Sequence, residues 1–100
     1  MSCYLIAAID IEDRETYGKY ENAAAQVLAG RSDIELLAID DSPFLLEGAM
    51  PGQRIVLLRF PSEEVFKEWY HGEGYQSAMQ FRKLASKTAF LLGAKGIEPG

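Results

Sequence analysis

The chain has 100 residues, of which 48% are hydrophobic and 25% charged, and its formal net charge is −5. This length and composition predict one soluble globular domain with a modest core. The negative charge and the lack of a basic run disfavour nucleic acid as a partner, because phosphate binding needs clustered Lys and Arg. The single cysteine, Cys3, excludes an intrachain disulfide and a cysteine metal cluster, and it favours a reducing compartment.

The N-terminal segment is apolar as far as Asp10 and contains no Lys or Arg. It therefore lacks the basic start of a signal peptide, and it is too short for a transmembrane helix. We expect no membrane association and a cytoplasmic location.

The first part of the chain predicts a strand, a helix and a second strand. Residues 3–11, CYLIAAIDI, form a short apolar run that is typical of a strand buried on both faces. From residue 12 to residue 30 the apolar residues follow a helical period, with Asp13 as the N-cap and Gly30 as the C′ residue. Residues 34–40, IELLAID, predict the second strand.

The centre of the chain predicts loops around a short extended piece. Residues 40–43, DDSP, are turn-forming. Residues 44–48, FLLEG, can continue as a short strand on the return side of a hairpin, before the loop AMPG at 49–52. Residues 53–60, QRIVLLRF, are the clearest strand of the chain.

The remainder predicts a broken helix and a last strand. Residues 61–70 begin a helix with Ser62 as its N-cap. The two glycines of HGEG, residues 71–74, release the backbone, and the helical period resumes at Tyr75. Residues 88–97, TAFLLGAKGI, predict the final strand.

The order β-α-β-β-α-β predicts an α+β, ferredoxin-like fold, with a four-stranded antiparallel sheet and two helices on one face. We expect one domain over residues 1–97, with 98–100 as a C-terminal tail. The strand at 55–60 is largely apolar on both sides, so the helix-free face would be exposed in a monomer. A homodimer with the two sheets packed face to face is the expected solution.

Three groups of residues carry a family resemblance: YLIAAIDIEDRETYGKY at the start, LLEG with RIVLLRFPS in the middle, and EWYHGEGYQ followed by Arg82. Together they resemble the small bacterial family called domain of unknown function 1330, over nearly the whole of residues 4–97. The combination of FPS, WY and the Tyr-Gln pair that follows is the most specific part.

The resemblance implies a ferredoxin-like domain of the dimeric α/β-barrel superfamily, in which two sheets join into a barrel. It implies no reaction, because the family has no established activity. Superfamily relatives include cofactor-free monooxygenases, muconolactone isomerase-like enzymes, haem-binding proteins and proteins without known catalysis. Fold analogy does not choose among these.

Candidate ligand-binding residues are aromatic or charged side chains on the predicted helices and strand ends: Asp10, Tyr20, Arg59, Trp69, Tyr70, His71, Tyr75 and Arg82. The aromatic members can line a pocket for a flat apolar ligand. They can equally be core residues whose polar tips reach the edge of the core, which is the favoured interpretation. The two interpretations are compatible, since a cavity in this architecture lies between sheet and helices.

His71 is the only histidine and can act as an acid or base near neutral pH. It has no neighbouring partners of a catalytic triad, however, and it follows Trp69 and Tyr70 at the end of a helical segment. An imidazolium is favourable at that position, so a structural or surface role is favoured.

For three charged residues, the sequence is compatible with either a binding role or a structural role. Asp10 and Arg59 lie toward strand ends among apolar neighbours, so they can hold a ligand, form an ion pair or stay solvated. Arg82 can clamp a ligand carboxylate, or it can bind Glu47 or Glu73 within the chain, and the structural role is favoured.

The sequence predicts no metal site and no cofactor, because it has one His and one Cys and the GEG stretch lacks the context of a phosphate loop. Two functions remain. The first is a homodimeric module that binds a small organic molecule without catalysis. The alternative is a cofactor-free small enzyme, monooxygenase- or isomerase-like, that uses the cavity between sheet and helices.

Overall fold

The computed structural model describes residues 1–97, so the predicted tail at 98–100 lies outside the described residues. Seven elements follow one another along the chain: β1 (Cys3–Ile11), α1 (Arg14–Ala29), β2 (Glu35–Asp40), β3 (Arg54–Phe60), α2 (Glu63–His71), α3 (Glu73–Ala85) and β4 (Ser86–Lys95).

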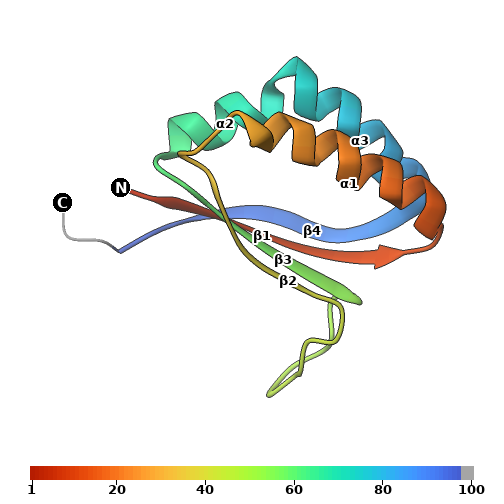
Figure 1. The fold of residues 1–100 in the computed structure, drawn as a ribbon. Coiled ribbons are helices and arrows are strands. Elements are labelled where there is room, and N and C mark those ends of the chain that lie inside the picture. The colour runs from red at the N-terminus through yellow and green to blue at the C-terminus, as the bar shows by residue number, and fades with distance from the viewer. Residues whose placement is uncertain (98–100) are drawn as a thin grey trace.

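The four strands form one antiparallel sheet in the order β2-β3-β1-β4. All three helices lie on the same face of this sheet, with α1 and α3 side by side (Figure 1). This is the predicted ferredoxin-like arrangement, in which α2 and α3 together take the place of the second helix. The fold prediction is therefore confirmed.

The helix ends follow the predicted chemistry. The Asp13 side chain accepts a hydrogen bond from the Thr16 backbone N–H at 3.2 Å, and the Ser62 hydroxyl accepts one from Val65 at 3.2 Å. Each cap satisfies a backbone donor that the first helical turn leaves free. Gly72 ends α2 and precedes α3, which confirms the predicted break in the second helix.

The core lies between the sheet and the helices. Along β1 every second side chain faces the helices, because strand side chains alternate between faces. The buried residues that form this core are Cys3, Leu5, Ala7, Ile9, Tyr17, Ile34, Leu58, Phe60, Trp69, Tyr75, Met79 and Ala85. On the other face of β1, Ala8 is buried but Tyr4 and Ile6 are only half-buried, so the strand is not fully buried on both sides.

Two boundary predictions are wrong. Residues 44–48 form no strand but part of a loop that projects from the sheet away from the helices (Figure 1), and Phe44 in this loop is 82% exposed. Without a neighbouring strand, the backbone there has no ladder to join. The last strand covers Ser86–Lys95 and not 88–97. It begins at Ser86, which pairs with Ile11 and whose hydroxyl donates to the Arg82 carbonyl at the end of α3.

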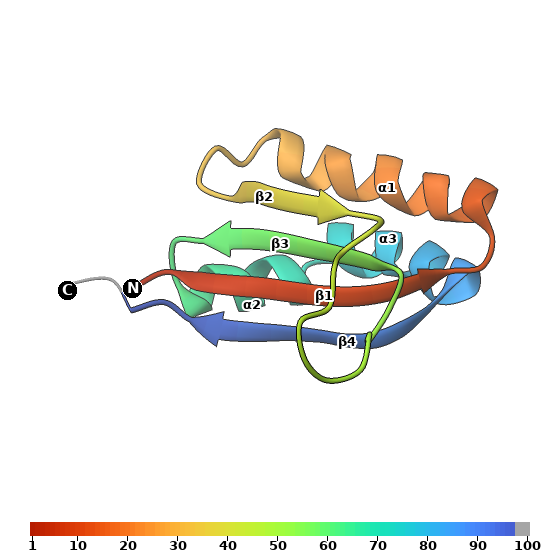
Figure 2. The ribbon, with the colours of Figure 1, turned by 90° about the horizontal axis from the view of Figure 1, so that it is seen from below.

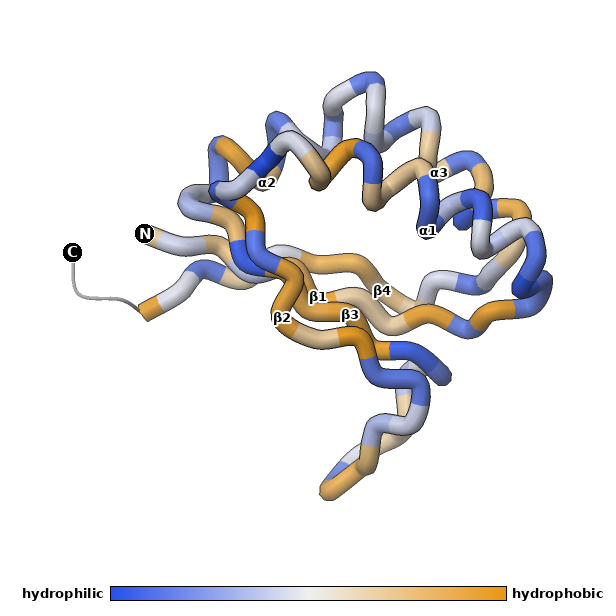
Figure 3. Tube along the Cα trace, viewed as in Figure 1, coloured by the Kyte–Doolittle hydropathy of each residue, from blue (hydrophilic) through white to orange (hydrophobic). Residues whose placement is uncertain are grey.

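The helix-free face of the sheet is apolar in its middle. Figure 2 looks onto this face, and the strands are among the more hydrophobic parts of the chain in Figure 3. Its central side chains are Ile6, Ala8, Ile55, Leu57, Phe90 and Leu92.

Within residues 1–97, no helix combines the length and the hydropathy needed to cross a lipid bilayer.

Candidate functional site

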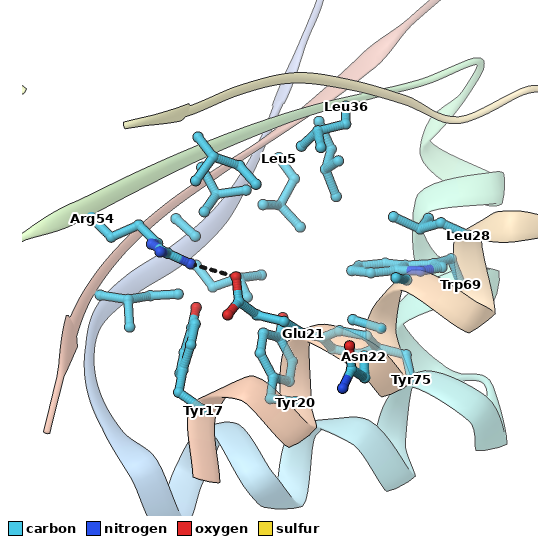
Figure 4. Close-up of a pocket in the computed structure, with 18 residues that line it drawn as sticks. Leu5, Tyr17, Tyr20, Glu21, Asn22, Leu28, Leu36, Arg54, Trp69 and Tyr75 are labelled. Atoms are coloured by element: carbon cyan, nitrogen blue, oxygen red, sulfur yellow. Dashed lines mark hydrogen bonds and ion pairs between the residues drawn. The ribbon is translucent and has the colours of Figure 1, made fainter. Parts of the chain in front are cut away.

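A cavity of about 350 Å³ lies between α1 and the sheet. α1 packs against α3, and two small side chains of α1, Ala24 and Ala25, line the cavity together with Leu36 and Ile39 of β2. The remaining lining is mainly aromatic and aliphatic and includes Leu5, Tyr17, Tyr20, Glu21, Asn22, Leu28, Arg54, Val56, Leu58, Trp69, Tyr75 and Leu91 (Figure 4). Its size lies at the lower end of the range for small-molecule pockets.

Aromatic side chains from all three helices form one wall of the cavity. The rings of Trp69 and Tyr75 lie 4.1 Å apart between centroids, and the Tyr20 and Tyr75 hydroxyl groups are hydrogen-bonded at 2.9 Å. Burial, followed by the proximity of Tyr75, raises the pKa of Tyr20 far above its usual value. Tyr20 is therefore a neutral hydrogen-bonding group at any physiological pH.

A charged cluster forms the polar end of the cavity. The Arg54 guanidinium donates from Nε and Nη2 to the two carboxylate oxygens of Asp41, at 2.6 and 3.0 Å, and from Nη1 to Glu21 Oε2 at 2.8 Å. Its side chain is only 9% exposed, so the paired charges are partly withdrawn from water. The hydrogen bonds to Asp41, and then those to Glu21, raise the pKa of Arg54, and Arg54 in turn lowers the pKa of Asp41.

Three of the predicted ligand-binding residues meet at this cavity. Tyr20, Trp69 and Tyr75 all line it, and they also pack in or against the hydrophobic core, so the two interpretations of the aromatics coincide. Tyr70 lies beside them, and its hydroxyl donates to the Met79 sulfur at 3.7 Å.

Arg82 is 4% exposed but does not line the cavity. It donates to the Thr88 hydroxyl, and its guanidinium lies 6.0 Å from the centre of the Tyr20 ring. The prediction that Arg82 could bind Glu47 or Glu73 is wrong, because neither residue forms an ion pair with Arg82 within residues 1–97. The position of Arg82 in the last turn of α3 favours its positive charge.

Asp10 and Arg59 lie on the same, helix-free face of the sheet but at opposite ends of the antiparallel strand pair, so they form no ion pair with each other. Asp10 Oδ1 accepts from the Gln53 backbone N–H at 2.8 Å, and Arg59 binds Glu35 at 2.7 Å. The structure therefore places both away from the cavity. His71 is exposed at the end of α2, with its ring 5.1 Å from that of Tyr70, and it is also outside the cavity lining.

The acidic partners of the polar end, Glu21 and Asp41, were not predicted. Glu21 follows Tyr17 by four positions, which places it on the same side of α1, and this spacing is the signal that could have found it. Asp41 looked like a turn residue, and nothing local in the sequence links it to Arg54. Among residues 1–97, no three His, Cys, Asp or Glu side chains gather as a metal-ligand set.

Comparison with known proteins agrees with this architecture. The model of a family described as domain of unknown function (DUF1330) matches residues 2–94. No curated protein matches the chain.

Three solved structures are similar in fold. A protein of unknown function from Rhodopseudomonas palustris, RPA0582, has a TM-score of 0.75 at 15% identity, and the match covers 98% of this chain and 84% of that one. A protein from Caulobacter crescentus, assigned provisionally to antibiotic biosynthesis monooxygenases, has a TM-score of 0.70 at 13% identity, with coverages of 97% and 91%. SnoaB from Streptomyces nogalater, a cofactor-independent oxygenase, has a TM-score of 0.64 at 8% identity, with coverages of 98% and 95%. At these identities the likeness establishes the ferredoxin-like, dimeric α/β-barrel type of fold and no activity.

Proposed function

The chain belongs to the DUF1330 family, whose description names no activity, and we propose from its cavity that it binds a small, flat, largely apolar organic molecule without catalysis. The observation that supports this is the cavity of about 350 Å³, with the closely packed, tilted rings of Trp69 and Tyr75 on one wall and Arg54 and Glu21 at its polar end. Apolar walls with a few polar groups are typical of small-molecule sites.

Isothermal titration with naphthalene-sized aromatic fragments tests this proposal. We expect wild-type protein to bind at least some fragments, and Ala24→Phe to abolish binding because the larger ring fills the cavity. Gln26→Phe is the matched control, since Gln26 is exposed on the same helix and outside the cavity lining. Failure of every fragment to bind the folded wild-type protein would refute the proposal.

A cofactor-free enzyme is the second candidate. The observation that favours it is the Glu21 carboxylate, which points into the cavity (Figure 4) and could accept a proton from a bound molecule. Hydrogen–deuterium exchange at an acidic C–H of a bound fragment, followed by NMR in D₂O, tests this step. Exchange that requires protein and is lost in Glu21→Gln would support catalysis, whereas exchange at the protein-free rate would favour binding alone.

We also propose that the protein is a homodimer in which the helix-free sheet faces pack together. The apolar middle of that face supports this, because an exposed apolar sheet face is unfavourable in a monomer. Analytical ultracentrifugation at micromolar concentration should give the dimer mass for the wild type and the monomer mass for Leu57→Asp. Leu84→Asp is the control, since Leu84 is 77% exposed on α3. A wild-type monomer would contradict the proposal.

The setting that we propose is the bacterial cytoplasm. The unpaired thiol of Cys3 supports this, since isolated cysteines are typical of reducing compartments.

A further inference from the structure

The polar end of the cavity carries an excess of negative charge. Arg54 supplies one positive charge, and Glu21 and Asp41 supply two negative charges, so the cluster has a net charge of −1. The three hydrogen bonds from the guanidinium to these carboxylates are short, between 2.6 and 3.0 Å, so its positive charge is already engaged by them.

Glu21 also has an acceptor oxygen without a partner among the described residues, and its side chain is 48% exposed. Its Oε2 atom receives the hydrogen bond from Arg54, and within residues 1–97 no donor reaches its Oε1 atom. Figure 4 shows this carboxylate directed into the cavity between Arg54 and Tyr20. An ionised carboxylate is an acceptor only, so the group that fits beside it is a hydrogen-bond donor.

We propose that the cavity selects flat ligands whose polar end is a neutral or cationic hydrogen-bond donor, such as an alcohol or an ammonium group, over ligands that end in a carboxylate. This inference rests on the proposed binding function and specifies the ligand class for the same cavity. A donor placed at the polar end gains a charge-assisted hydrogen bond to Glu21.

A ligand carboxylate would meet the opposite situation. It would lie against the Glu21 carboxylate, and two like charges in contact repel each other. The Glu21 side chain is 48% exposed, so water and salt moderate this repulsion. Arg82 is a nearby cation, whose guanidinium donates to the neutral Thr88 hydroxyl and lies 6.0 Å from the centre of the Tyr20 ring. It is outside the cavity lining, so the charged group that a ligand meets at the polar end is Glu21.

The test is calorimetric titration with three probes that share one ring system: naphthylmethylamine, which is cationic at neutral pH, naphthylmethanol and naphthoate. We expect the amine and the alcohol to bind wild-type protein at least about tenfold more tightly than naphthoate. Glu21→Gln should reduce the difference in affinity between naphthoate and the other two probes, because it removes the negative charge. Glu15→Gln changes the net charge equally on an exposed part of α1 outside the cavity lining, and it should leave the ranking unchanged.

The outcomes separate this inference from the function on which it rests. If naphthoate binds as tightly as the other two probes, or more tightly, the inference is wrong while the cavity remains a binding site. If none of the three probes binds, the proposed function fails and the inference fails with it. The order of the three probe affinities for wild-type protein tests the proposed ligand preference even if Glu21→Gln does not fold.

Discussion

The hydroxyl groups of Tyr20 and Tyr75 lie 2.9 Å apart and join α1 to the start of α3 across the aromatic wall of the cavity. Tyr75 is 1% exposed, so its hydroxyl has little access to water as an alternative partner. This contact is a direct link between the two helices that frame the site.

Removal of either hydroxyl should weaken this link. We expect Tyr20→Phe and Tyr75→Phe each to lower the free energy of unfolding by about 0.5–1.5 kcal/mol, as is typical for a partly buried hydrogen bond. The double variant should cost less than the sum of the two, because the second substitution removes a group that has already lost its partner. Urea denaturation measures all three values, and strict additivity would show that the hydroxyl groups do not interact.

Trp69 should be one of the most stabilising side chains. It is 5% exposed and packs against Phe60 at 5.2 Å and Tyr75 at 4.1 Å between ring centroids. We expect Trp69→Ala to lower stability by about 3–5 kcal/mol, because a large cavity remains in the core. Leu84→Ala removes an exposed side chain and should change stability by less than about 0.5 kcal/mol. Similar losses for both variants would contradict the packing described above.

Two glycines should respond in opposite ways to alanine. A Cβ at Gly52 would lie 2.9 Å from the backbone nitrogen of Ile9, whereas a Cβ at Gly18 would meet nothing within 4 Å. Gly52→Ala must displace β1 or the loop and should cost about 1–3 kcal/mol. Gly18→Ala lies inside α1 and should add about 0.5–1 kcal/mol. Thermal unfolding of the two variants checks both signs, and a neutral Gly52→Ala would show that the loop does not press against β1.

The ion pair between Asp41 and Arg54 should make stability depend on pH in the acid range. Arg54 lowers the pKa of Asp41 below its ordinary value of 3.8, so the pair stabilises the fold above that value and the stabilisation is lost as pH falls through the lowered pKa. Asp41→Asn should therefore be less stable than the wild type at neutral pH, and the difference should shrink at acid pH.

The salt dependence of stability distinguishes the loss of this ion pair from a change in packing. The Asp41 side chain is 44% exposed, so the difference between wild type and Asp41→Asn should be modest and should fall at high ionic strength. Unfolding curves at neutral and acid pH, each at low and high salt, provide the comparison. A difference that stays constant with pH would show that the charge of Asp41 does not carry the effect.

The sequence predicted the fold well where the signal is local. The apolar run of β3, the caps Asp13 and Ser62 and the glycine break at Gly72 each depend on residues close in the chain. The loop at 44–48 was mistaken for a strand because apolar residues alone do not supply a pairing partner. The aromatic candidates Tyr20, Trp69 and Tyr75 were found because their helical spacing is visible in the sequence.

The charged residues show what only the tertiary structure decided. Asp10 and Arg59 have similar local surroundings in the sequence, but the antiparallel register of β1 and β3 places them at opposite ends of the sheet. Arg54 meets Glu21 and Asp41 only because α1 and the loop after β2 converge on the first residue of β3. Local propensities and periodicity determined the elements and the buried stripes of this protein. The pairing of charges at the cavity depends on how those elements pack, and residues that lie 13 and 33 positions apart in the chain carry no local sign of that contact.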